Sequence, residues 1–378
     1  MSTSTPRMNA SGRYSVDSSA ETALRNEAAT AHIIPAEATI LVTGANGFIG
    51  SRVVRALLLR DFRRIRCLTR STTASQSLAV LRKEFGADRL EVLVGNLLSP
   101  EDCLRATEGV SVIYHLAAGI EKTFPGCFLN SVVTTRNLLD AAVRQQGLKR
   151  FVNVSSLAVY SNAKLRRGAP LDETCEVDTA LAERYDPYAY AKAKQDAIVL
   201  SYAENQRLPY VIVRPGVAFG PGKAKLPGRV GTDTFGLFLH LGLNNRMPLT
   251  YVTNCADAIV LAGLTPGVEG EVINVVDDDL PTSRHVLRMY KQQVRRLISI
   301  PIPYRVFYVL SHIWEAYSRW SEGQLPPAFN RKTCSAYFKG NTYSNKKAKS
   351  LLGWHPRVHM GDALQHYFAF ARKSKGSK

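Results

Sequence analysis

The chain has 378 residues, enough for two or three domains of ordinary size or for one large α/β domain with an annex. Its content of 45% hydrophobic and 21% charged residues excludes a disordered, collagenous or fibrous chain, and its apolar runs are too short for a transmembrane helix. The net charge of +18 favours anionic partners such as nucleotides, nucleic acid or an acidic membrane surface; a basic surface without a specific role is the alternative.

Six cysteines are scattered along the chain, and no two of them form a C-x-x-C pair. In a chain of this length the pattern favours free thiols in a reducing compartment over a disulfide framework or a zinc site. We therefore expect a cytoplasmic protein without a metal centre.

The two ends of the chain differ in composition from the rest. Residues 1–36 are rich in Ser, Thr, Ala, Asn and Glu and contain no apolar run like that of a secretory signal. They are predicted to form a flexible tail. Residues 372–378 are predicted to form a short basic tail.

Between the tails, short apolar runs alternate with segments of helical spacing. Strands are predicted over residues 38–42, 65–68, 91–94, 110–116, 151–154 and 210–214, and helices over residues 48–60, 130–144 and 188–204. This alternation predicts βαβ units and an α/β fold with a doubly wound parallel sheet, a Rossmann fold, over residues 37–215. The irregular pattern that follows predicts a smaller C-terminal α/β lobe, mainly for substrate binding, over residues 216–371.

The first predicted strand runs into a turn with the spacing G-x-x-G-x-x-G. Gly44 permits a tight turn, Gly47 lets a pyrophosphate approach the backbone, and Gly50 lets the next helix pack closely on the strand. That helix directs free N–H groups and the positive end of its dipole at the phosphates. The context predicts dinucleotide binding, with a plain strand-turn-helix as the alternative. The predicted contacts in this turn are Gly44, Asn46, Gly47, Phe48, Ile49 and Gly50.

Arg70 follows the second strand, where an acidic residue would bind the 2′-OH of NAD. A guanidinium suits a 2′-phosphate, so this position favours NADP over NAD as the cofactor. The alternative is an arginine that stacks on adenine and is indifferent to the phosphate.

Five motifs occur in a fixed order along the chain: TGANGFIG at 43–50, YHLAA at 114–118, SSLAVY at 155–160, YAYAK at 188–192 and RPGVAFGPG at 214–222. As a set they resemble the extended short-chain dehydrogenases/reductases of the NAD-dependent epimerase/dehydratase superfamily. The resemblance covers roughly residues 38 to 370.

Tyr188 and Lys192 stand four residues apart on a predicted helix, and therefore on one face of it. An ammonium beside a phenol lowers the pKa of the phenol from about 10 toward neutrality, which suits general acid/base catalysis. The resemblance implies that Tyr188 is this acid/base, that Lys192 also binds the nicotinamide ribose, and that Ser156 hydrogen-bonds the substrate oxygen.

Tyr190 and Lys194 have the same spacing as Tyr188 and Lys192. The family places a proline before the catalytic tyrosine and an acidic residue eight positions after it. Pro187 and the acidic residue at position 196 fit Tyr188, so the first pair is favoured.

The resemblance implies six further cofactor contacts, for which packing alone is the alternative. Asn96 departs from the aspartate that the family usually has near the adenine, while His115 is expected to be a buried core residue. The predicted contacts are Asn96 and Leu97 at the adenine, Ala117 and Ala118 in the cofactor groove, and Pro215 and Val217 over the nicotinamide.

Apolar side chains recur every three or four residues over 306–320, which predicts an amphipathic helix. With its flanking segments, this region resembles the C-terminal part of the 3β-hydroxysteroid dehydrogenase and sterol-4α-carboxylate dehydrogenase branch. The resemblance implies that the helix helps to bind a large apolar substrate or a membrane surface. An ordinary core helix is the alternative.

The sequence thus predicts an NAD(P)(H)-dependent oxidoreductase that transfers a hydride between nicotinamide and a secondary alcohol or ketone, sterol-like or otherwise apolar. A UDP-sugar epimerase of polysaccharide biosynthesis is the alternative. Leu157 and Ala158 stand where sugar 4,6-dehydratases carry Asp-Glu, which disfavours dehydration. The expected partners are a small-molecule substrate, a second copy of the chain and, peripherally, a membrane surface; no nucleic-acid-binding signature is present.

Overall fold

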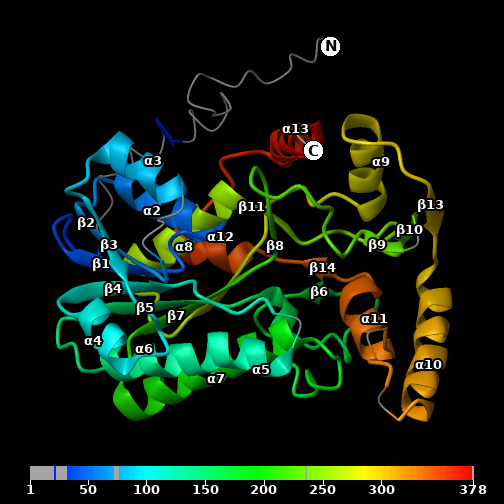
Figure 1. The fold of residues 1–378 in the computed structure, drawn as a ribbon, viewed down its shortest axis with the longest axis horizontal. Coiled ribbons are helices and arrows are strands. Elements are labelled where there is room, and N and C mark those ends of the chain that lie inside the picture. Colours follow the sequence, from blue (N-terminus) through cyan, green and yellow to red (C-terminus); the bar gives the residue numbers. More distant parts are fainter. Residues whose placement is uncertain are drawn as a thin grey trace.

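The computed structural model describes residues 21–22, 32–71, 76–121, 123–234, 236–322, 324–327 and 329–376. Its central feature is a parallel seven-stranded sheet in the order β12-β7-β5-β4-β1-β2-β3 (Figure 1). The strands are β1 (Thr39–Thr43), β2 (Arg64–Thr69), β3 (Leu90–Val94), β4 (Val110–His115), β5 (Arg150–Val154), β7 (Tyr210–Pro215) and β12 (Val272–Val275). The predicted doubly wound parallel sheet is confirmed, and its order reverses between β1 and β4.

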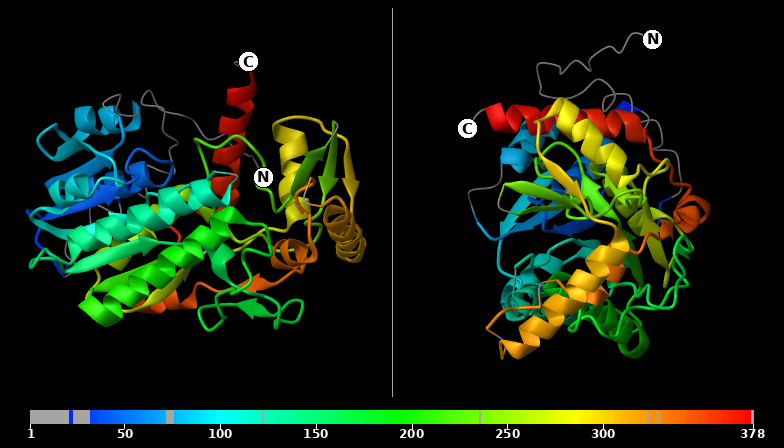
Figure 2. Two further views of the ribbon diagram at one scale, coloured as in Figure 1. Left: turned by 60° about the horizontal axis from the view of Figure 1, so that its bottom comes forward. Right: turned by 90° about the vertical axis from the view of Figure 1, so that its right-hand side faces the viewer.

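Helices cover both faces of this sheet, as Figures 1 and 2 show. One face carries α2 (Gly50–Leu59), α3 (Gln76–Phe85), α8 (Val252–Leu264) and α12 (Lys346–Leu352). The other carries α4 (Pro100–Thr107), α6 (Thr134–Ala142) and α7 (Pro187–Gln206). Because neither face meets solvent, all five residues of β5 are buried, which explains the continuous apolar runs in the sequence.

Two features of this domain were not predicted from the sequence. The helices α3 and α4 bury few side chains, and α3 buries only Leu78 and Leu81, so their periodicity is weak. The helix predicted over residues 130–144 begins after the short α5 (Phe124–Cys127) as a π-helical turn, Phe128–Val133, and continues as α6 only from Thr134.

The second lobe contains three small sheets, in the orders β13-β10-β9, β11-β8 and β14-β6. Their strands are β6 (Pro170–Leu171), β8 (Val217–Phe219), β9 (Gly231–Thr234), β10 (Leu237–His240), β11 (Leu249–Tyr251), β13 (Ser299–Pro301) and β14 (Thr342–Tyr343). Its helices are α9 (Ser283–Gln293), α10 (Tyr304–Trp320), α11 (Arg331–Phe338) and α13 (Met360–Gly376). The smaller C-terminal α/β lobe expected from the sequence is therefore present.

The chain does not divide between the lobes at one point. After β11, α8 packs against α2, and β12 then pairs with β7 at the edge of the large sheet. The boundary near residue 216 stays a prediction, and α8 and β12, which follow it in the sequence, contact the large sheet or its helices. The strand β12 covers the edge of β7, and α8 covers the apolar face of α2.

The structure describes part of each predicted tail. Residues 1–20 and 23–31 lie outside the described residues, but Ile34 is buried and the backbone N–H of Ile33 donates to Leu264 O at 3.0 Å. At the other end α13 continues to Gly376, so residues 372–376 are helical, and residues 377–378 lie outside the described part.

The helix predicted over 306–320 is α10, which lies with α11 at one edge of the second lobe (Figure 2). Of its 17 residues only Ser311 and Ser318 are buried, whereas Ile313 and Trp320 are 59% and 76% exposed. The core-helix alternative is therefore wrong. Within the described ranges, no helix combines the length and the apolarity needed to cross a bilayer.

Candidate active site

A cavity of about 830 Å³ lies at the carboxyl edge of the large sheet, where β1, β4, β5 and β7 end. Ligands of open α/β sheets bind at this edge, next to the reversal of strand order. The cavity brings together most residues that the sequence singled out. Those that line it are Gly44, Gly47, Phe48, Ile49, Gly50, Ala118, Ser156, Tyr188, Lys192, Pro215 and Val217.

The glycine-rich turn forms one wall of this cavity. Gly44 has a φ of +66°, and a Cβ there would lie 2.9 Å from Ala117 N. A Cβ on Gly50 would lie 2.1 Å from Gly44 O, so only glycine lets α2 start this close to β1. The turn therefore exposes backbone at the start of a helix, which is the form that a phosphate site takes.

Ser156, Tyr188 and Lys192 line the same cavity. Ser156 follows β5 and accepts a hydrogen bond from Ala158 N at 3.2 Å, while Tyr188 and Lys192 lie in the first two turns of α7. The Ser156 side chain also lies close enough to Tyr188 to influence its pKa. The Lys192 ammonium donates to Val154 O at 2.6 Å and to Gln195 Oε1 at 2.9 Å.

The acid/base properties of the pair differ from the sequence expectation. Burial raises the pKa of Tyr188 to about 12, although the nearby Ser156 side chain opposes this. Burial also lowers the pKa of Lys192 to about 8, against the attraction of Asp196. The expected lowering of the Tyr188 pKa by Lys192 is absent in this structure, because the ammonium is held by Val154 O and Gln195.

The second tyrosine-lysine pair lies elsewhere on α7. The Tyr190 ring packs edge-on against Phe124 at 5.5 Å, and Lys194 Nζ lies 5.7 Å from the centre of the same ring. Neither residue lines the cavity. The structure therefore brings Tyr188 and Lys192 together with Ser156 and keeps the alternative pair away from it.

A chain of hydrogen bonds connects Lys192 to the first strand. Gln195 Nε2 donates to Thr135 Oγ1 at 2.7 Å, and His115 contacts Thr135 Oγ1 and Thr43 Oγ1, each at 2.8 Å. Burial lowers the pKa of His115 to about 3, so its imidazole is neutral. The predicted core role of His115 is confirmed, and this histidine also ties α6 to β1.

A buried ion pair joins α7, the helix that carries Tyr188, to the strand β7. Asp196 Oδ2 accepts from Arg214 Nη2 at 3.0 Å and from Ser155 Oγ at 2.8 Å, and Asp196 Oδ1 accepts from Asn153 Nδ2 at 2.8 Å. Arg214 also stacks over the Tyr160 ring at 4.6 Å. Asp196 thus joins α7 to the ends of β5 and β7, the two strands beside the cavity.

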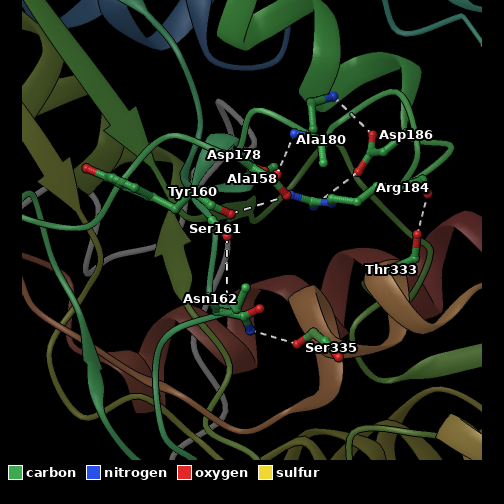
Figure 3. A network of polar contacts seen from close by, with 12 residues as sticks. Ala158, Tyr160, Ser161, Asn162, Asp178, Ala180, Arg184, Asp186, Thr333 and Ser335 are labelled. Carbon is green, nitrogen blue, oxygen red and sulfur yellow. Dashed lines mark hydrogen bonds and ion pairs between the residues drawn. The ribbon is translucent and has the colours of Figure 1, made fainter.

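The start of α7 is fixed by a second buried network around Arg184 (Figure 3). Arg184 Nη1 donates to Ala158 O at 3.0 Å, and its Nη2 lies 3.6 Å from the Asp186 carboxylate. Asp186 caps α7 by accepting from Ala189 N at 3.0 Å and also accepts from Tyr337 Oη of α11. Arg184 therefore couples the loop after Ser156 to the helix that carries Tyr188.

The remaining predicted cofactor contacts do not line the cavity. Arg70 and Asn96 are exposed just beyond the paired ends of β2 and β3, whereas Leu97 is buried. Asn96 Oδ1 accepts from Leu98 N at 3.0 Å. Arg70 thus follows β2, the neighbour of β1, and Asn96 and Leu97 follow the edge strand β3, while Asn46 is exposed and Ala117 half-buried.

Other lining residues were not predicted. Lys223 Nζ lies 4.6 Å from the centre of the Phe48 ring, and Arg229 enters from the second lobe. Aromatic residues of α10, α11 and the segment between them form a further wall; they are Phe307, Phe329, Tyr337 and Phe338. Phe307 belongs to the periodic pattern noted in the sequence and Phe329 to a segment that flanks it, whereas Tyr337 and Phe338 are brought in by the fold of the lobe.

The residues at the cavity fit a dinucleotide cofactor. The turn leaves no room for a Cβ at Gly50, and the described lining residues include Lys192, Lys223 and Arg229 but no carboxylate. An anionic pyrophosphate at the turn would therefore meet backbone N–H groups and the ammonium of Lys223, which lies over Phe48.

Three comparisons with known proteins bear on this geometry. The model of the NAD dependent epimerase/dehydratase family matches residues 40–275, more than half of the chain. The chain is similar to cinnamoyl-CoA reductase 1 of Oryza sativa subsp. japonica, with 32% identity over 184 residues. That match covers 48% of this chain and 54% of the rice enzyme, about half of its length.

A longer match is to 2-alkyl-3-oxoalkanoate reductase of Stenotrophomonas maltophilia (strain K279a), with 26% identity over 345 residues, 86% of this chain and 97% of that one. Among solved structures, UDP-glucuronic acid 4-epimerase from Bacillus cereus, in complex with UDP-glucuronic acid and NAD, has a TM-score of 0.67 and 21% identity. The alignment covers 89% of this chain and 99% of that one and shows a common fold.

Proposed function

The chain belongs to the NAD dependent epimerase/dehydratase family, and from this membership we propose that it is an NAD(P)(H)-dependent oxidoreductase acting on an apolar secondary alcohol or ketone. The observation that carries the proposal is the meeting of Ser156, Tyr188 and Lys192 in one cavity with the glycine-rich turn. The apolar character of the substrate rests on the aromatic wall from α10 and α11.

In this proposal each side chain acts on the substrate oxygen or on its neighbours. Tyr188 gives a proton to the oxygen during reduction and takes it back during oxidation. Ser156 holds the same oxygen by a hydrogen bond, and the Lys192 ammonium, one helical turn from Tyr188 on α7, is the positive charge available to the site when the phenol gives up its proton. The residues of the glycine-rich turn would hold the cofactor pyrophosphate, and the bound nicotinamide supplies the hydride chemistry.

The names of the relatives agree with a carbonyl substrate. The rice and Stenotrophomonas proteins are, by name, reductases of a cinnamoyl thioester and of an alkyl oxoalkanoate. The C-terminal resemblance to the sterol dehydrogenase branch also favours a large apolar substrate, because α10 and α11 together wall the cavity with phenyl rings.

A UDP-sugar epimerase is the second candidate, supported by the likeness of fold to the Bacillus enzyme. The two are distinguished by denaturing freshly purified protein and identifying any released nucleotide by mass spectrometry. An epimerase reoxidises its own cofactor and retains it, so near-stoichiometric bound NAD would favour the epimerase. An empty protein that consumes NADPH or NADH with apolar ketones would support the proposed reductase.

We expect Arg70→Ala to weaken NADPH binding by about tenfold or more and to leave NADH binding nearly unchanged. The reason is that a guanidinium beside the ribose contributes mainly through a 2′-phosphate, and a charged hydrogen bond is worth about 1.5–3 kcal/mol. Fluorescence titration of both cofactors measures this. Equal losses for NADPH and NADH would contradict the preference for NADP.

We expect kcat/KM for ketone reduction to fall as the pH rises through about 8. Burial lowers the pKa of Lys192 to about 8, so above this pH the ammonium is lost, while Tyr188, with a pKa of about 12, keeps its proton. Lys192→Arg should remove the fall below pH 10, since a guanidinium stays charged. A wild-type profile that is flat to pH 10 would contradict this role.

Two associations complete the proposal. α10 exposes Val306, Leu310 and Ile313 and carries Arg305 and Arg319, a combination that favours peripheral contact with anionic lipid. Failure to sediment with anionic vesicles at low salt would exclude this contact. By resemblance to the family we also propose that the protein is a homodimer, and light scattering would measure its mass in solution. We further propose a cytoplasmic location.

A further inference from the structure

In the described lining of the catalytic cavity, the second lobe contributes two charged side chains, Lys223 and Arg229. Lys223 Nζ lies over Phe48, in the phosphate-binding turn, and donates to Ala218 O at 3.1 Å. Lys192 is held beside Tyr188 by Val154 O. Two of the three cavity cations thus belong to the cofactor turn and to the catalytic pair, and Arg229 belongs to neither.

The Arg229 guanidinium is fixed by aromatic neighbours. It stacks over the Tyr337 ring at 4.7 Å and lies 5.9 Å from the centre of the Tyr343 ring. Nη1 donates to Tyr343 Oη at 3.1 Å and to Tyr337 O at 3.4 Å. Within the described residues Arg229 forms no ion pair with a carboxylate, and both of its hydrogen bonds there use Nη1, so Nε and Nη2 remain for another acceptor.

The surroundings of Arg229 restrict what that acceptor is. The described lining holds no carboxylate, and the same lining includes the rings of Phe307, Phe329 and Phe338. A half-buried guanidinium next to apolar rings suits a ligand with an anionic head and an apolar body, because the planar fork of arginine binds carboxylate and phosphate oxygens in pairs.

We propose that Arg229 is a specificity-determining residue that binds an anionic group, a carboxylate or a phosphoryl group, on an otherwise apolar substrate. The inference rests on the proposed function and narrows its substrate to amphipathic oxo or hydroxy acids or their phosphorylated counterparts. The proposed pyrophosphate site at the glycine-rich turn does not account for Arg229, because the described contacts of this guanidinium are with Tyr337 and Tyr343 of the second lobe.

Equilibrium binding of matched probes tests this without turnover. Calorimetry would compare decanoate, decyl phosphate and decanamide on the wild type, on Arg229→Met and on Arg246→Met. Arg246 is the matched control, because its guanidinium also donates to a backbone carbonyl of this lobe, Leu280 O, but lies outside the cavity lining. Thermal melting of each variant shows whether the fold is retained.

We expect the wild type and Arg246→Met to bind at least one anionic probe about tenfold or more tightly than decanamide. Arg229→Met should lose that preference and keep its affinity for decanamide. A carboxylate is identified if decanoate is favoured, and a phosphoryl group if decyl phosphate is favoured. No preference in the wild type, no binding of either anion at millimolar concentration, or a preference that survives Arg229→Met would overturn the proposal.

The outcome is separable from that of the proposed function. Binding of the probes requires neither cofactor nor Tyr188, so a wild type that reduces no ketone would refute the oxidoreductase and leave this measurement valid. Conversely, active turnover of ketones with no anion preference would refute only the role of Arg229.

Discussion

Tyr188→Phe should reduce kcat by roughly 10²–10⁴-fold and leave cofactor affinity unchanged, because the change removes only the proton that general acid/base catalysis transfers. The ring of Tyr188 keeps its place in the cavity, so packing against the cofactor site is retained. Stopped-flow measurement of hydride transfer and a separate cofactor titration distinguish the two effects.

The chain contains a matched control for this variant. Tyr190→Phe makes the same chemical change two residues later, on a side chain that packs against Phe124 outside the cavity. It should keep activity close to that of the wild type. Full activity of Tyr188→Phe, or an equal loss in both variants, would contradict the assignment of Tyr188 as the acid/base.

Asp196→Ala should lower the free energy of unfolding by about 3–5 kcal/mol, the usual cost of leaving one partner of a buried ion pair uncompensated. Burial already raises the pKa of Asp196, and its carboxylate depends on Arg214, Ser155 and Asn153 as partners. Removing it leaves the Arg214 guanidinium buried and without this partner. Urea unfolding at pH 7 measures the loss.

Two comparisons show whether the loss arises from burial. Glu176→Ala breaks an ion pair with Lys164 in which both side chains are exposed, and should change stability by no more than about 0.5 kcal/mol. The double variant Asp196→Leu with Arg214→Met removes both buried charges and should be more stable than Asp196→Ala alone. Equal stability of Asp196→Ala and the wild type would refute the role of the pair.

The parts of the fold that the sequence predicts are those with a strong local signal. The strands of the large sheet are buried on both faces, and the glycine spacing from Gly44 to Gly50 is dictated by contacts as short as 2.1 Å to Gly44 O. Tyr188, Lys192 and Ser156 were identified because resemblance and spacing agreed. Their meeting in one cavity follows from the parallel order of the strands.

The parts that the sequence did not predict depend on contacts between distant segments. Arg229 and Tyr337 are 108 residues apart, and nothing in their local sequence indicates that one stacks on the other. The solvent exposure of α10 could not be predicted either, because the sequence of an apolar helix face has the same periodicity whether that face is buried or exposed. The pKa of Tyr188 depends on burial and on where the Lys192 ammonium is held, which spacing does not encode.

The position of β12 late in the sequence has a consequence for folding during translation. The strand occupies the outer edge of the large sheet beside β7, yet it is translated only after β8, β9, β10 and β11 of the other lobe. Until then the nascent chain presents β7 as an open edge, which is a template for intermolecular pairing. A ribosome that stalls or terminates between residues 216 and 271 therefore releases an aggregation-prone product, and any shortened form made for expression has to extend beyond Val275.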